Sequence, residues 1–202
     1  MRKPSSLTIP CDPIDASDRT AARVALQARR AALVGPARQA ADRAIVASLQ
    51  RTVAQFAPRV LAGYWPMRDE PDLREALAQW HRAGVVVALP RVAVPASPLH
   101  FGRWSPGTLL ARGPFGTVHP EPHDPLEPDL LVLPCLGFDA RCQRLGYGGG
   151  YYDRTLAALA GVRAIGVAYD GCEVVGFDEQ PHDRALDAVV TERRVLLRSP
   201  AG

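Results

Sequence analysis

The spacing of apolar residues changes along this chain, and near the N-terminus it predicts helices. Apolar and alanine positions recur at helical spacing through "RTAARVALQARRAALV", and Asp18, just before them, is a residue that caps helix N-termini. We therefore expect a first helix that runs from Asp18 to Gly35. A second, alanine-rich helix is predicted from Ala37 to Gln55, where the apolar positions keep nearly the same period.

Two later segments also carry helix patterns. The segment "DLREALAQWHRAG" places Leu73, Leu77 and Trp80 on one face and ends at Gly84, a residue that suits a helix C-terminus. The segment "YYDRTLAALAG" ends in the same way at Gly161 and is predicted to be another helix.

Several short runs are apolar throughout, which is typical of strands that are buried on both faces of a sheet. They are "RVLAGYWP", "VVVALP", "LLVLP" and "RAIGVAYD", and the chain finishes with "DAVVTE" and "RRVLL". Short strands and turns are expected around "PLHFGRWSPGTLLARGPFG", followed by a surface loop, "HPEPHDPLEPD". Strands that alternate with helices predict an open, Rossmann-like α/β fold with a mostly parallel sheet and helices on both faces.

The chain of 202 residues predicts one domain with a large core. Residues 1–16 contain proline and serine without periodicity, so we expect a flexible N-terminal arm there. Residues 17–202 show neither an internal repeat nor a long linker, and they are predicted to form a single α/β domain.

Composition and charge narrow the classes of function. The net charge of +3 comes from arginine, because Lys3 is the only lysine. This mild excess suits a small anionic ligand and lacks the dense basic stripe of nucleic-acid binders. The first residues contain no apolar signal segment, and no run approaches the ~20 apolar residues of a membrane-spanning helix. The 4 cysteines form no C-x-x-C pair, so we expect reduced thiols and a cytoplasmic location. We also expect a monomer that binds neither membrane nor nucleic acid.

The stretch "RLGYGGGYYDR", from Arg144 to Arg154, places four glycines within five positions between charged residues. It follows a predicted strand and precedes a predicted helix, which is where open α/β sheets bind ligands. Glycines let backbone N–H groups approach phosphate oxygens closely, and the following helix adds its N-terminal amides. The two arginines would add charge-assisted hydrogen bonds, and Asp153 could hold Mg²⁺ against the phosphates.

This stretch matches neither of the common phosphate-binding motifs. It lacks the G-K-[ST] of a P-loop, and Tyr151 stands where the dinucleotide motif G-x-G-x-x-G requires glycine. A tight connection is therefore an alternative interpretation of the glycines, and burial in the core is an alternative for Tyr151 and Tyr152.

Two further clusters could belong to a ligand site. Arg19, Arg23 and Arg30 are spaced so that they lie along one face of the first helix, although a solvated face is the alternative. Trp65 and Glu70 follow a strand end and could recognise a heterocycle that carries amino and ring N–H donors. The alternative for Glu70 is a helix cap, which acidic residues favour.

The segment "LPCLGFDARCQRLGYGGGYYDRTL" resembles the signature of the 5-formyltetrahydrofolate cyclo-ligases, also called methenyltetrahydrofolate synthetases. That signature runs P-x-x-x-F-D and then R-L-G-x-G-x-G-Y-Y-D. This chain carries all of its residues: Pro134, Phe138, Asp139, Arg144, Leu145, Gly146, Gly148, Gly150, Tyr151, Tyr152 and Asp153. Other pieces occur in the family's order, namely the first-helix arginines, Asp69-Glu70, Pro90-Arg91, "GTVHPEP" and "PHDRALDAVVTE". The resemblance covers about Ser17 to Glu192.

The resemblance implies a three-layer α/β/α fold whose single domain is catalytic. It implies that ATP and Mg²⁺ drive the cyclisation of 5-formyltetrahydrofolate (folinate) to 5,10-methenyltetrahydrofolate, with ADP and phosphate as the other products. In the mechanism proposed for the family, the formyl oxygen attacks the γ-phosphate to give an N5-iminium phosphate. N10 then attacks the activated carbon, and phosphate leaves.

The resemblance also implies roles for individual residues of this sequence. The implied catalytic residues are Arg144 and Tyr152. The implied ATP contacts are Arg19, Arg23, Arg144, Leu145, Gly146, Tyr147, Gly148, Gly149, Gly150, Tyr151 and Tyr152. The implied folate contacts are Trp65, Glu70, Tyr147, Gly148, Gly149, Gly150 and Tyr151. The implied Mg²⁺ ligands are Asp153 and Asp187.

Two positions depart from the family pattern. Arg19 stands where the family usually has lysine, which keeps the charge but replaces a compact ammonium with a planar fork. Tyr147 fills a position that is basic in many relatives. A non-catalytic folate- or nucleotide-binding protein on the same fold is the alternative function. A sugar-phosphate isomerase or CoA-transferase-like enzyme is a third possibility, which rests on fold analogy alone.

Overall fold

The structure is a computed structural model that describes residues 12–178, 180 and 183–199. Over those residues the helices are α1 (Arg19–Ala31), α2 (Gly35–Phe56), α3 (Arg74–Arg82) and α4 (Tyr151–Ala158), with short 3₁₀ turns at Pro114–Gly116 and Asp170–Cys172. The predicted cap is present, because the Asp18 side chain accepts hydrogen bonds from the Thr20 and Ala21 amides at the start of α1. The predicted face of α3 is confirmed as well, since Leu77 and Trp80 are buried.

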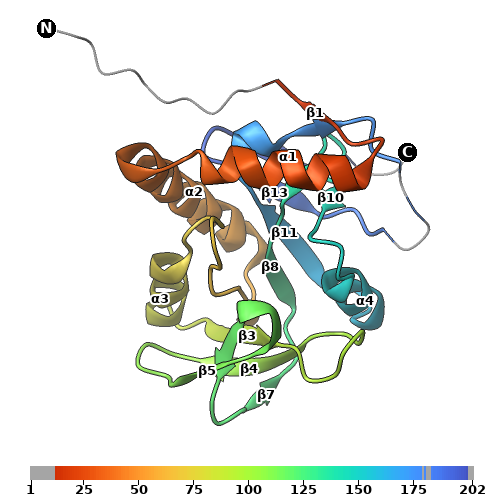
Figure 1. The fold of residues 1–202 in the computed structure, drawn as a ribbon. Coiled ribbons are helices and arrows are strands. Elements are labelled where there is room, and N and C mark those ends of the chain that lie inside the picture. Colours follow the sequence, from red (N-terminus) through yellow and green to blue (C-terminus); the bar gives the residue numbers. More distant parts are fainter. Residues whose placement is uncertain (1–11, 179, 181–182, 200–202) are drawn as a thin grey trace, which may run out of the picture.

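The main sheet has eight strands in the order β14-β13-β11-β8-β2-β3-β4-β7 (Figure 1). Their bounds are β2 (Val60–Ala62), β3 (Val86–Arg91), β4 (His100–Trp104), β7 (Pro125–Leu126), β8 (Leu130–Pro134), β11 (Arg163–Val167), β13 (Ala188–Val190) and β14 (Val195–Leu197). The five inner strands from β13 to β3 are parallel, whereas β14, β4 and β7 pair antiparallel at the two edges. The mostly parallel sheet is therefore confirmed.

Helices cover both faces of this sheet, so the three-layer α/β/α prediction is confirmed. Successive residues of β8 point to opposite faces: Leu130 and Val132 pack in the core beneath α1, α2 and α3, whereas Leu131 and Leu133 pack in the core beneath α4. Both faces of the central strands are apolar for this reason. In Figure 1, α4 lies apart from the other three helices, on the far side of β8 and β11.

Three small two-stranded sheets complete the fold. They are β1 (Ile14–Asp15) with β12 (Val174–Val175), β5 (Leu110–Arg112) with β6 (Val118–Pro120), and β9 (Gly137–Phe138) with β10 (Arg144–Leu145). The first of them changes the picture of the N-terminal arm. Ile14 pairs in parallel with Val174, and Ala16 is fully buried, so the described end of the expected arm is docked. Residues 1–11 of that arm lie outside the described residues, and the division into arm and domain stays a prediction.

Several predicted element bounds need correction. α1 ends at Ala31 rather than Gly35, because Gly35 already starts α2. Pro36 in the first turn of α2 explains this, since proline suits a helix start and disfavours helical backbone in the residue before it. α4 ends at Ala158, before Gly161. The proline-rich segment expected to be a loop contributes residues to β6 and β7.

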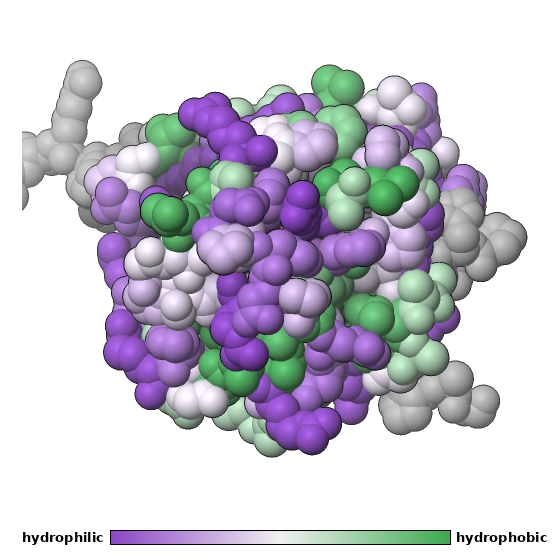
Figure 2. All heavy atoms as spheres, turned by 90° about the horizontal axis from the view of Figure 1, so that it is seen from below, coloured by the Kyte–Doolittle hydropathy of each residue, from purple (hydrophilic) through white to green (hydrophobic). Residues whose placement is uncertain are grey.

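The surface mixes polar and apolar side chains. On the face drawn in Figure 2, hydrophobic residues lie in small groups between hydrophilic ones. None of the helices in the described ranges is long and apolar enough to span a bilayer. The most exposed large apolar side chains are Leu109 and Phe115, with exposed fractions of 76% and 72%. Both lie in the segment around the β5–β6 hairpin, and Phe115 belongs to the site described next.

Candidate active site

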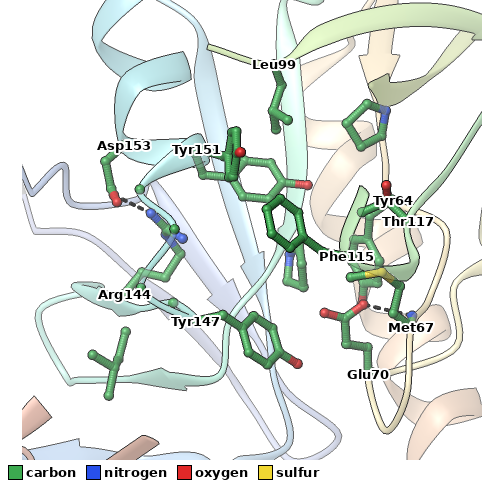
Figure 3. Close-up of a pocket in the computed structure, with 18 of the residues that line it drawn as sticks. Tyr64, Met67, Glu70, Leu99, Phe115, Thr117, Arg144, Tyr147, Tyr151 and Asp153 are labelled. Atoms are coloured by element: carbon green, nitrogen blue, oxygen red, sulfur yellow. Dashed lines mark hydrogen bonds and ion pairs between the residues drawn. The ribbon is translucent and has the colours of Figure 1, made fainter. Parts of the chain in front are cut away.

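A cavity of about 710 Å³ opens beside the carboxyl end of β8. The glycine loop, residues 146–150, lines this cavity just before α4 begins. Its walls come from the start of α1, the segment between β2 and α3, the β5–β6 turn and residues 144–153. Figure 3 shows the glycine-loop side chains facing the segment between β2 and α3 across the open space. The cavity thus lies at the strand ends where α/β sheets hold ligands.

A hairpin carries the glycine loop to this position. The prediction placed the loop directly after the buried strand, but β9 and β10 intervene between β8 and the glycines. Asp139 closes the hairpin turn, because its side chain accepts hydrogen bonds from the amides of Arg141 (2.9 Å) and Gln143 (2.8 Å). Gly148 has φ +94° and Gly150 has φ +64°, conformations that L side chains rarely adopt. The sequence needs glycine at these two positions for that reason.

Arginine side chains fasten the backbone of the loop from two directions. Arg23 on α1 donates from Nε to the Gly146 carbonyl at 2.9 Å. Arg154 on α4 donates to the Gly149 carbonyl at 2.7 Å and stacks over the Tyr151 ring at 5.1 Å. These hydrogen bonds connect the loop backbone to α1 on one side and to α4 on the other.

Arg144 and Asp153 form a largely buried ion pair at the end of the loop (Figure 3). The exposed fraction is 5% for the Arg144 side chain and 22% for the Asp153 side chain. The Arg144 guanidinium also lies 5.6 Å from the centre of the Tyr152 ring, and its Nε is buried with no hydrogen-bond partner in the described part of the chain. A buried, incompletely satisfied guanidinium is a strong binding group for an anion.

The start of α4 adds uncharged donors to the same region. Gly150 is the N-cap of this helix and offers no side-chain cap. The first amides of a helix have no intrahelical acceptors, and they carry the positive end of the helix dipole. Together with the glycine loop they form a backbone surface suited to phosphate oxygens.

Arg19 reaches the cavity from the start of α1 and is held by a carboxylate and a backbone carbonyl. It donates to an Asp183 carboxylate oxygen and to the Asp178 carbonyl, each at 2.5 Å, and its guanidinium lies 4.5 Å from the centre of the Phe177 ring. The Asp183 side chain is only 7% exposed. The closing segment of the chain therefore brings a carboxylate into the cavity through Asp183.

Glu70 faces the glycine loop from the opposite wall (Figure 3). Its exposed fraction is 1%, and its Oε2 accepts a hydrogen bond from the Met67 amide at 2.9 Å. Its Oε1 is buried and makes no hydrogen bond of normal geometry in the described ranges, although the Tyr147 hydroxyl lies near enough to stabilise the carboxylate. Burial raises the pKa of the Glu70 carboxyl, while the Met67 amide, the charge of Arg30 and the Tyr147 hydroxyl oppose this shift. An unsatisfied buried acceptor at a cavity wall is suited to a ligand that brings N–H donors.

Aromatic rings line the space between these polar walls. The ring centres of Trp65 and Trp104 lie 6.2 Å apart, and those of Phe115 and Tyr151 lie 6.0 Å apart. Tyr147 projects from the glycine loop toward the Glu70 side (Figure 3), and burial together with the charge of Glu70 raises its pKa to about 12. The cavity thus combines flat apolar surfaces with a few fixed polar groups, as small-molecule sites do.

The structure brings nearly all of the predicted site residues to this cavity. They are Arg19, Arg23, Trp65, Glu70, Arg144, Leu145, Gly146, Tyr147, Gly148, Gly149, Gly150, Tyr151, Tyr152 and Asp153. Arg30, the third arginine of the first helix, is buried behind it and donates to the Asp69 carbonyl at 3.1 Å.

Asp187 is the exception, and the predicted ion site of Asp153 with Asp187 needs correction. Asp187 directly precedes β13, and its carboxylate accepts from the Ala164 amide at 2.7 Å and pairs with Arg163 at 3.0 Å. Those partners lie at the amino end of β11, whereas Asp153 lies beyond the carboxyl ends of the strands. The two aspartates therefore occupy opposite ends of the sheet.

Sequence reasoning missed other residues that line the cavity. They include Gln27, Tyr64, Met67, Arg68, Val92, Leu99, Phe115, Thr117, Val118, Gln180 and Asp183. Two signals were available. Asp183 lies four residues before Asp187 in the same closing segment, and Phe115 lies in the "PFGTVHPEP" turn, where an apolar ring between glycines has no helical or strand face to join.

Comparison with known proteins identifies relatives of this chain. The sequence matches the model of the 5-formyltetrahydrofolate cyclo-ligase family over residues 15–192. It is 34% identical over 149 residues to the 5-formyltetrahydrofolate cyclo-ligase of Mycolicibacterium smegmatis, an alignment that covers 69% of this chain and 76% of that protein. It is also 34% identical over 135 residues to the protein of the same name from Escherichia coli K12, covering 62% of this chain and 74% of that one.

Two solved structures are similar to the whole molecule. The NMR structure of Aquifex aeolicus 5,10-methenyltetrahydrofolate synthetase superposes with a TM-score of 0.78 at 26% identity, covering 91% of this chain and 94% of that one. A 5,10-methenyltetrahydrofolate synthetase from Mycoplasma pneumoniae gives a TM-score of 0.72 at 23% identity, covering 87% and 99%. At 23% identity, this second similarity concerns the fold alone.

Proposed function

The chain belongs to the 5-formyltetrahydrofolate cyclo-ligase family, and from this premise we propose that it converts 5-formyltetrahydrofolate to 5,10-methenyltetrahydrofolate at the cost of ATP. ADP and phosphate are the other products. The observation that carries the proposal is the arrangement of one cavity: the glycine loop with the buried Arg144 lies on one wall, and the buried Glu70 carboxylate, whose Oε1 makes no hydrogen bond of normal geometry in the described ranges, lies on the other.

The triphosphate of ATP would occupy the glycine-loop side. Gly148 and Gly150 expose backbone there, α4 contributes its first amides, and Arg144 contributes a buried cation. Arg19 and Arg23 from α1 would add charge, and Leu145, Gly146, Tyr147, Gly149, Tyr151 and Tyr152 would complete the contact surface. Since Arg19 now pairs with Asp183, phosphate binding would require it to share or exchange that partner.

The folate would occupy the opposite side, with its flat pterin ring between the aromatic walls. Glu70 would accept hydrogen bonds from the amino and ring N–H groups of the pterin through its unsatisfied Oε1. Trp65 would provide apolar surface, while residues 147–151 would contact the part of the folate nearest the phosphates. In this pose the formyl group would point toward Arg144.

The reaction would then proceed by two displacements. The formyl oxygen attacks the γ-phosphorus, the bond to the bridging oxygen of ADP breaks, and ADP leaves. The lone pair of N10 attacks the activated formyl carbon, the carbon–oxygen bond to phosphate breaks, and the N10 proton is released. The second step is intramolecular once the folate is held bent, which accounts for much of the rate.

The protein would contribute positioning and charge to both steps. Arg144 would stabilise the charge that moves from the γ-phosphoryl group onto ADP and later onto phosphate. Burial raises the pKa of Tyr152, so its hydroxyl stays protonated and can donate a hydrogen bond to the reacting oxygen. These are the two residues for which we propose a catalytic role.

The residues of the cavity fit a magnesium ion that arrives with ATP. Mg²⁺ is usually held by one or two carboxylates together with substrate phosphates. The described ranges hold no preformed group of three or more possible metal-ligating side chains, but Asp153 and Asp183 both line the cavity beside the proposed phosphate site. Asp153 would hold the ion with Asp183 in place of Asp187, and the ion would neutralise phosphate charge.

The decisive experiment follows the absorbance band of methenyltetrahydrofolate with purified protein, folinate, Mg²⁺ and ATP, omitting each component in turn. Growth of the band only in the complete mixture would establish the reaction and its requirements. Binding of folinate without any band would instead favour the alternative of a non-catalytic folate-binding protein. If the protein neither binds folinate nor produces the band, the proposal is overturned. The predicted cytoplasmic location and monomeric state stay predictions.

A further inference from the structure

We propose that α2 positions the proposed folate-binding carboxylate, with Arg38 and Asp42 as positioning residues that hold the Glu70 loop. This loop is defined as residues 67–72. The inference rests on the function proposed above for Glu70. Neither Arg38 nor Asp42 lines the cavity, so any effect they have on folate must pass through the loop.

The Glu70 loop does not hold its own shape by regular secondary structure. Its turn is closed by a hydrogen bond from the Glu70 amide to the Met67 carbonyl at 3.0 Å, and Glu70 Oε2 accepts from the Met67 amide. Arg68 has φ +49°, in the left-handed region that a residue with a Cβ adopts rarely. Such a conformation persists when surrounding groups enforce it.

Arg38 supplies much of that enforcement from outside the cavity. Its Nη1 donates to the Asp69 carboxylate at 2.9 Å. Its Nη2 donates to the Glu70 carbonyl at 3.1 Å and to the Arg68 carbonyl at 3.3 Å. One planar guanidinium thus contacts three successive residues of the loop, including the strained one. Arg30 on α1 adds a hydrogen bond to the Asp69 carbonyl.

Asp42 holds the other end of the same loop. It follows Arg38 by four residues on α2, so the two side chains lie on one face of the helix. Its Oδ1 accepts from the Asp72 amide at 3.3 Å and from the Tyr169 hydroxyl at 2.7 Å. Tyr169 follows β11 and is fully buried. The loop is therefore fastened at its turn by Arg38 and at its end by a carboxylate that is anchored to the sheet.

This arrangement predicts a selective kinetic effect. Loss of the Arg38 contacts would let the loop relax, and the Glu70 carboxylate would no longer stand ready for the pterin donors. The proposed ATP groups on the opposite wall are held by Arg23 and Arg154 instead, so they would be unaffected. We expect Arg38→Ala to raise the KM for folinate about tenfold while leaving the KM for ATP within about twofold.

Matched variants test the proposal. Arg38→Lys keeps the charge but lacks the planar fork, so it should restore only part of the folinate affinity. Asp69→Ala removes one Arg38 partner from the loop side and should give a smaller effect of the same kind. Arg43→Ala alters an exposed arginine on the same helix and should match the wild type. Hydrogen exchange of the amides in residues 67–72 should be faster in Arg38→Ala than in the wild type.

The possible outcomes separate the two proposals. An Arg38→Ala protein with wild-type folinate KM and unchanged exchange in the loop would overturn the positioning role. Equal increases in both KM values would also overturn it, because they would indicate general damage. If the wild type produces no methenyltetrahydrofolate at all, the proposed function fails, and the exchange comparison still decides whether Arg38 holds the loop.

Discussion

The Glu70 carboxylate is buried, and only one of its two oxygens accepts a hydrogen bond of normal geometry in the described part of the chain. Its Oε2 accepts this hydrogen bond from the Met67 amide, whereas its Oε1 makes none of normal geometry there, although the nearby Tyr147 hydroxyl stabilises the carboxylate. A buried acceptor left in this state costs stability, and binding sites are where such costs are found. The interpretation of Glu70 as a helix cap is not supported, because α3 begins at Arg74 and Glu70 accepts no hydrogen bond from its amides.

Glu70→Gln should raise the stability of the protein and weaken its binding of folinate. Burial raises the pKa of Glu70 above the ordinary value of 4.5. For an acid this means that folding disfavours the charged form, so at a pH above its folded-state pKa the Glu70 carboxyl lowers the free energy of unfolding. This destabilisation disappears as the pH falls below the pKa of the unfolded state. Glutamine should therefore stabilise the protein at pH 7 by about 1 kcal/mol, measured by urea denaturation, while weakening folinate binding about thirtyfold.

The pH dependence of binding provides the check on this substitution. In the wild type, folinate affinity should fall on acidification at a pH above 4.5, because the raised pKa makes the carboxylate protonate early. Glu70→Gln should lose this acidic decline. An identical decline in both proteins would show that Glu70 does not accept the folate hydrogen bonds.

Asp153→Asn and Asp187→Asn form a pair that tests the corrected ion site. Asp153→Asn should raise the Mg²⁺ concentration needed for half-maximal activity about tenfold or more, because a carboxylate beside the proposed phosphate site is lost. Asp187→Asn should leave that requirement unchanged and lower the melting temperature, since Asp187 pairs with Arg163 and caps the Ala164 amide. Magnesium titrations and thermal unfolding of both variants distinguish these effects, and a reversed pattern would return Asp187 to the ion site.

At the scale of elements, the placement of the glycine loop depends on pieces that are far apart in the sequence. α1 contributes Arg23 to the Gly146 carbonyl, and β9 and β10 form the hairpin that turns the chain toward α4. α1 in turn packs on the segment that contains β1 and β12, since Ala16, Ala22, Leu26 and Val174 share one core. The N-terminal strand therefore supports the helix that supports the loop.

Two truncations test this support. Removing residues 1–16 deletes β1. This removes two hydrogen bonds, from the Ile14 amide to the Glu173 carbonyl (3.0 Å) and from the Ala16 amide to the Val175 carbonyl (2.8 Å). We expect a loss of about 2 kcal/mol in the free energy of unfolding, or about 6 °C in Tm. Removing residues 1–11 should leave Tm and activity unchanged, because it spares β1. An equal loss of stability in both truncated proteins, measured by calorimetry, would contradict the supporting role of β1.

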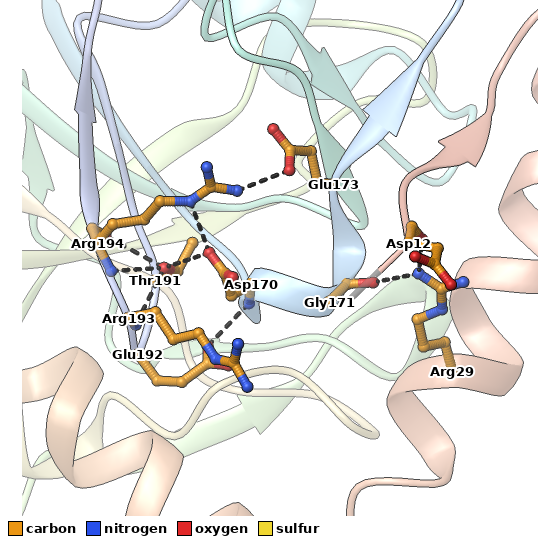
Figure 4. A network of polar contacts seen from close by, with 9 residues as sticks. All are labelled: Asp12, Arg29, Asp170, Gly171, Glu173, Thr191, Glu192, Arg193 and Arg194. Carbon is orange, nitrogen blue, oxygen red and sulfur yellow. Dashed lines mark hydrogen bonds and ion pairs between the residues drawn. The ribbon is translucent and has the colours of Figure 1, made fainter. Parts of the chain in front are cut away.

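At the scale of the whole molecule, a polar network connects the β13–β14 hairpin, the 3₁₀ turn Asp170–Cys172 and α1 (Figure 4). Asp170 accepts from Thr191 Oγ1 at 3.1 Å and from Arg194 Nε at 2.8 Å. Arg194 also donates to Glu173 at 2.7 Å. On the other side of the same 3₁₀ turn, Arg29 of α1 donates to the Gly171 carbonyl at 2.8 Å. The turn after β11 is thereby fixed between the β13–β14 hairpin and α1.

Arg194→Ala should weaken the fold without altering the site. Asp170 is largely buried, and it would lose its cationic partner. We expect the free energy of unfolding to fall by about 2 kcal/mol in urea denaturation. Arg193→Ala, which changes the exposed neighbour, should have little effect. Since neither arginine lines the cavity, an increase in the folinate or ATP KM with unchanged stability would refute this assignment.

Much of the architecture could be read from local pattern. Continuous apolar runs predicted the buried strands β3, β8 and β11, because strands covered on both faces need apolar residues at every position. The helix cap at Asp18 and the apolar face of α3 follow from side-chain chemistry and period alone. The bounds of α1 and α4 were less predictable, since tertiary packing decides how far the last turn of a helix extends.

The sequence by itself determined the chemistry of the glycine loop, because the order of glycines, arginine and aspartate is local and its residues are adjacent in the chain. It also determined that Arg19, Arg23 and Glu70 were candidates for one site. Only the tertiary structure decided which residues meet across the cavity. Asp183 lines the cavity, whereas Asp187 does not. Asp187 lies at the amino end of β11, and the cavity lies at the carboxyl ends of the parallel strands, so the segment from Asp183 to Asp187 runs from one edge of the sheet to the other. The unsatisfied Glu70 oxygen and its support by α2 were decided in the same way, by burial and by contacts between segments that no local pattern records.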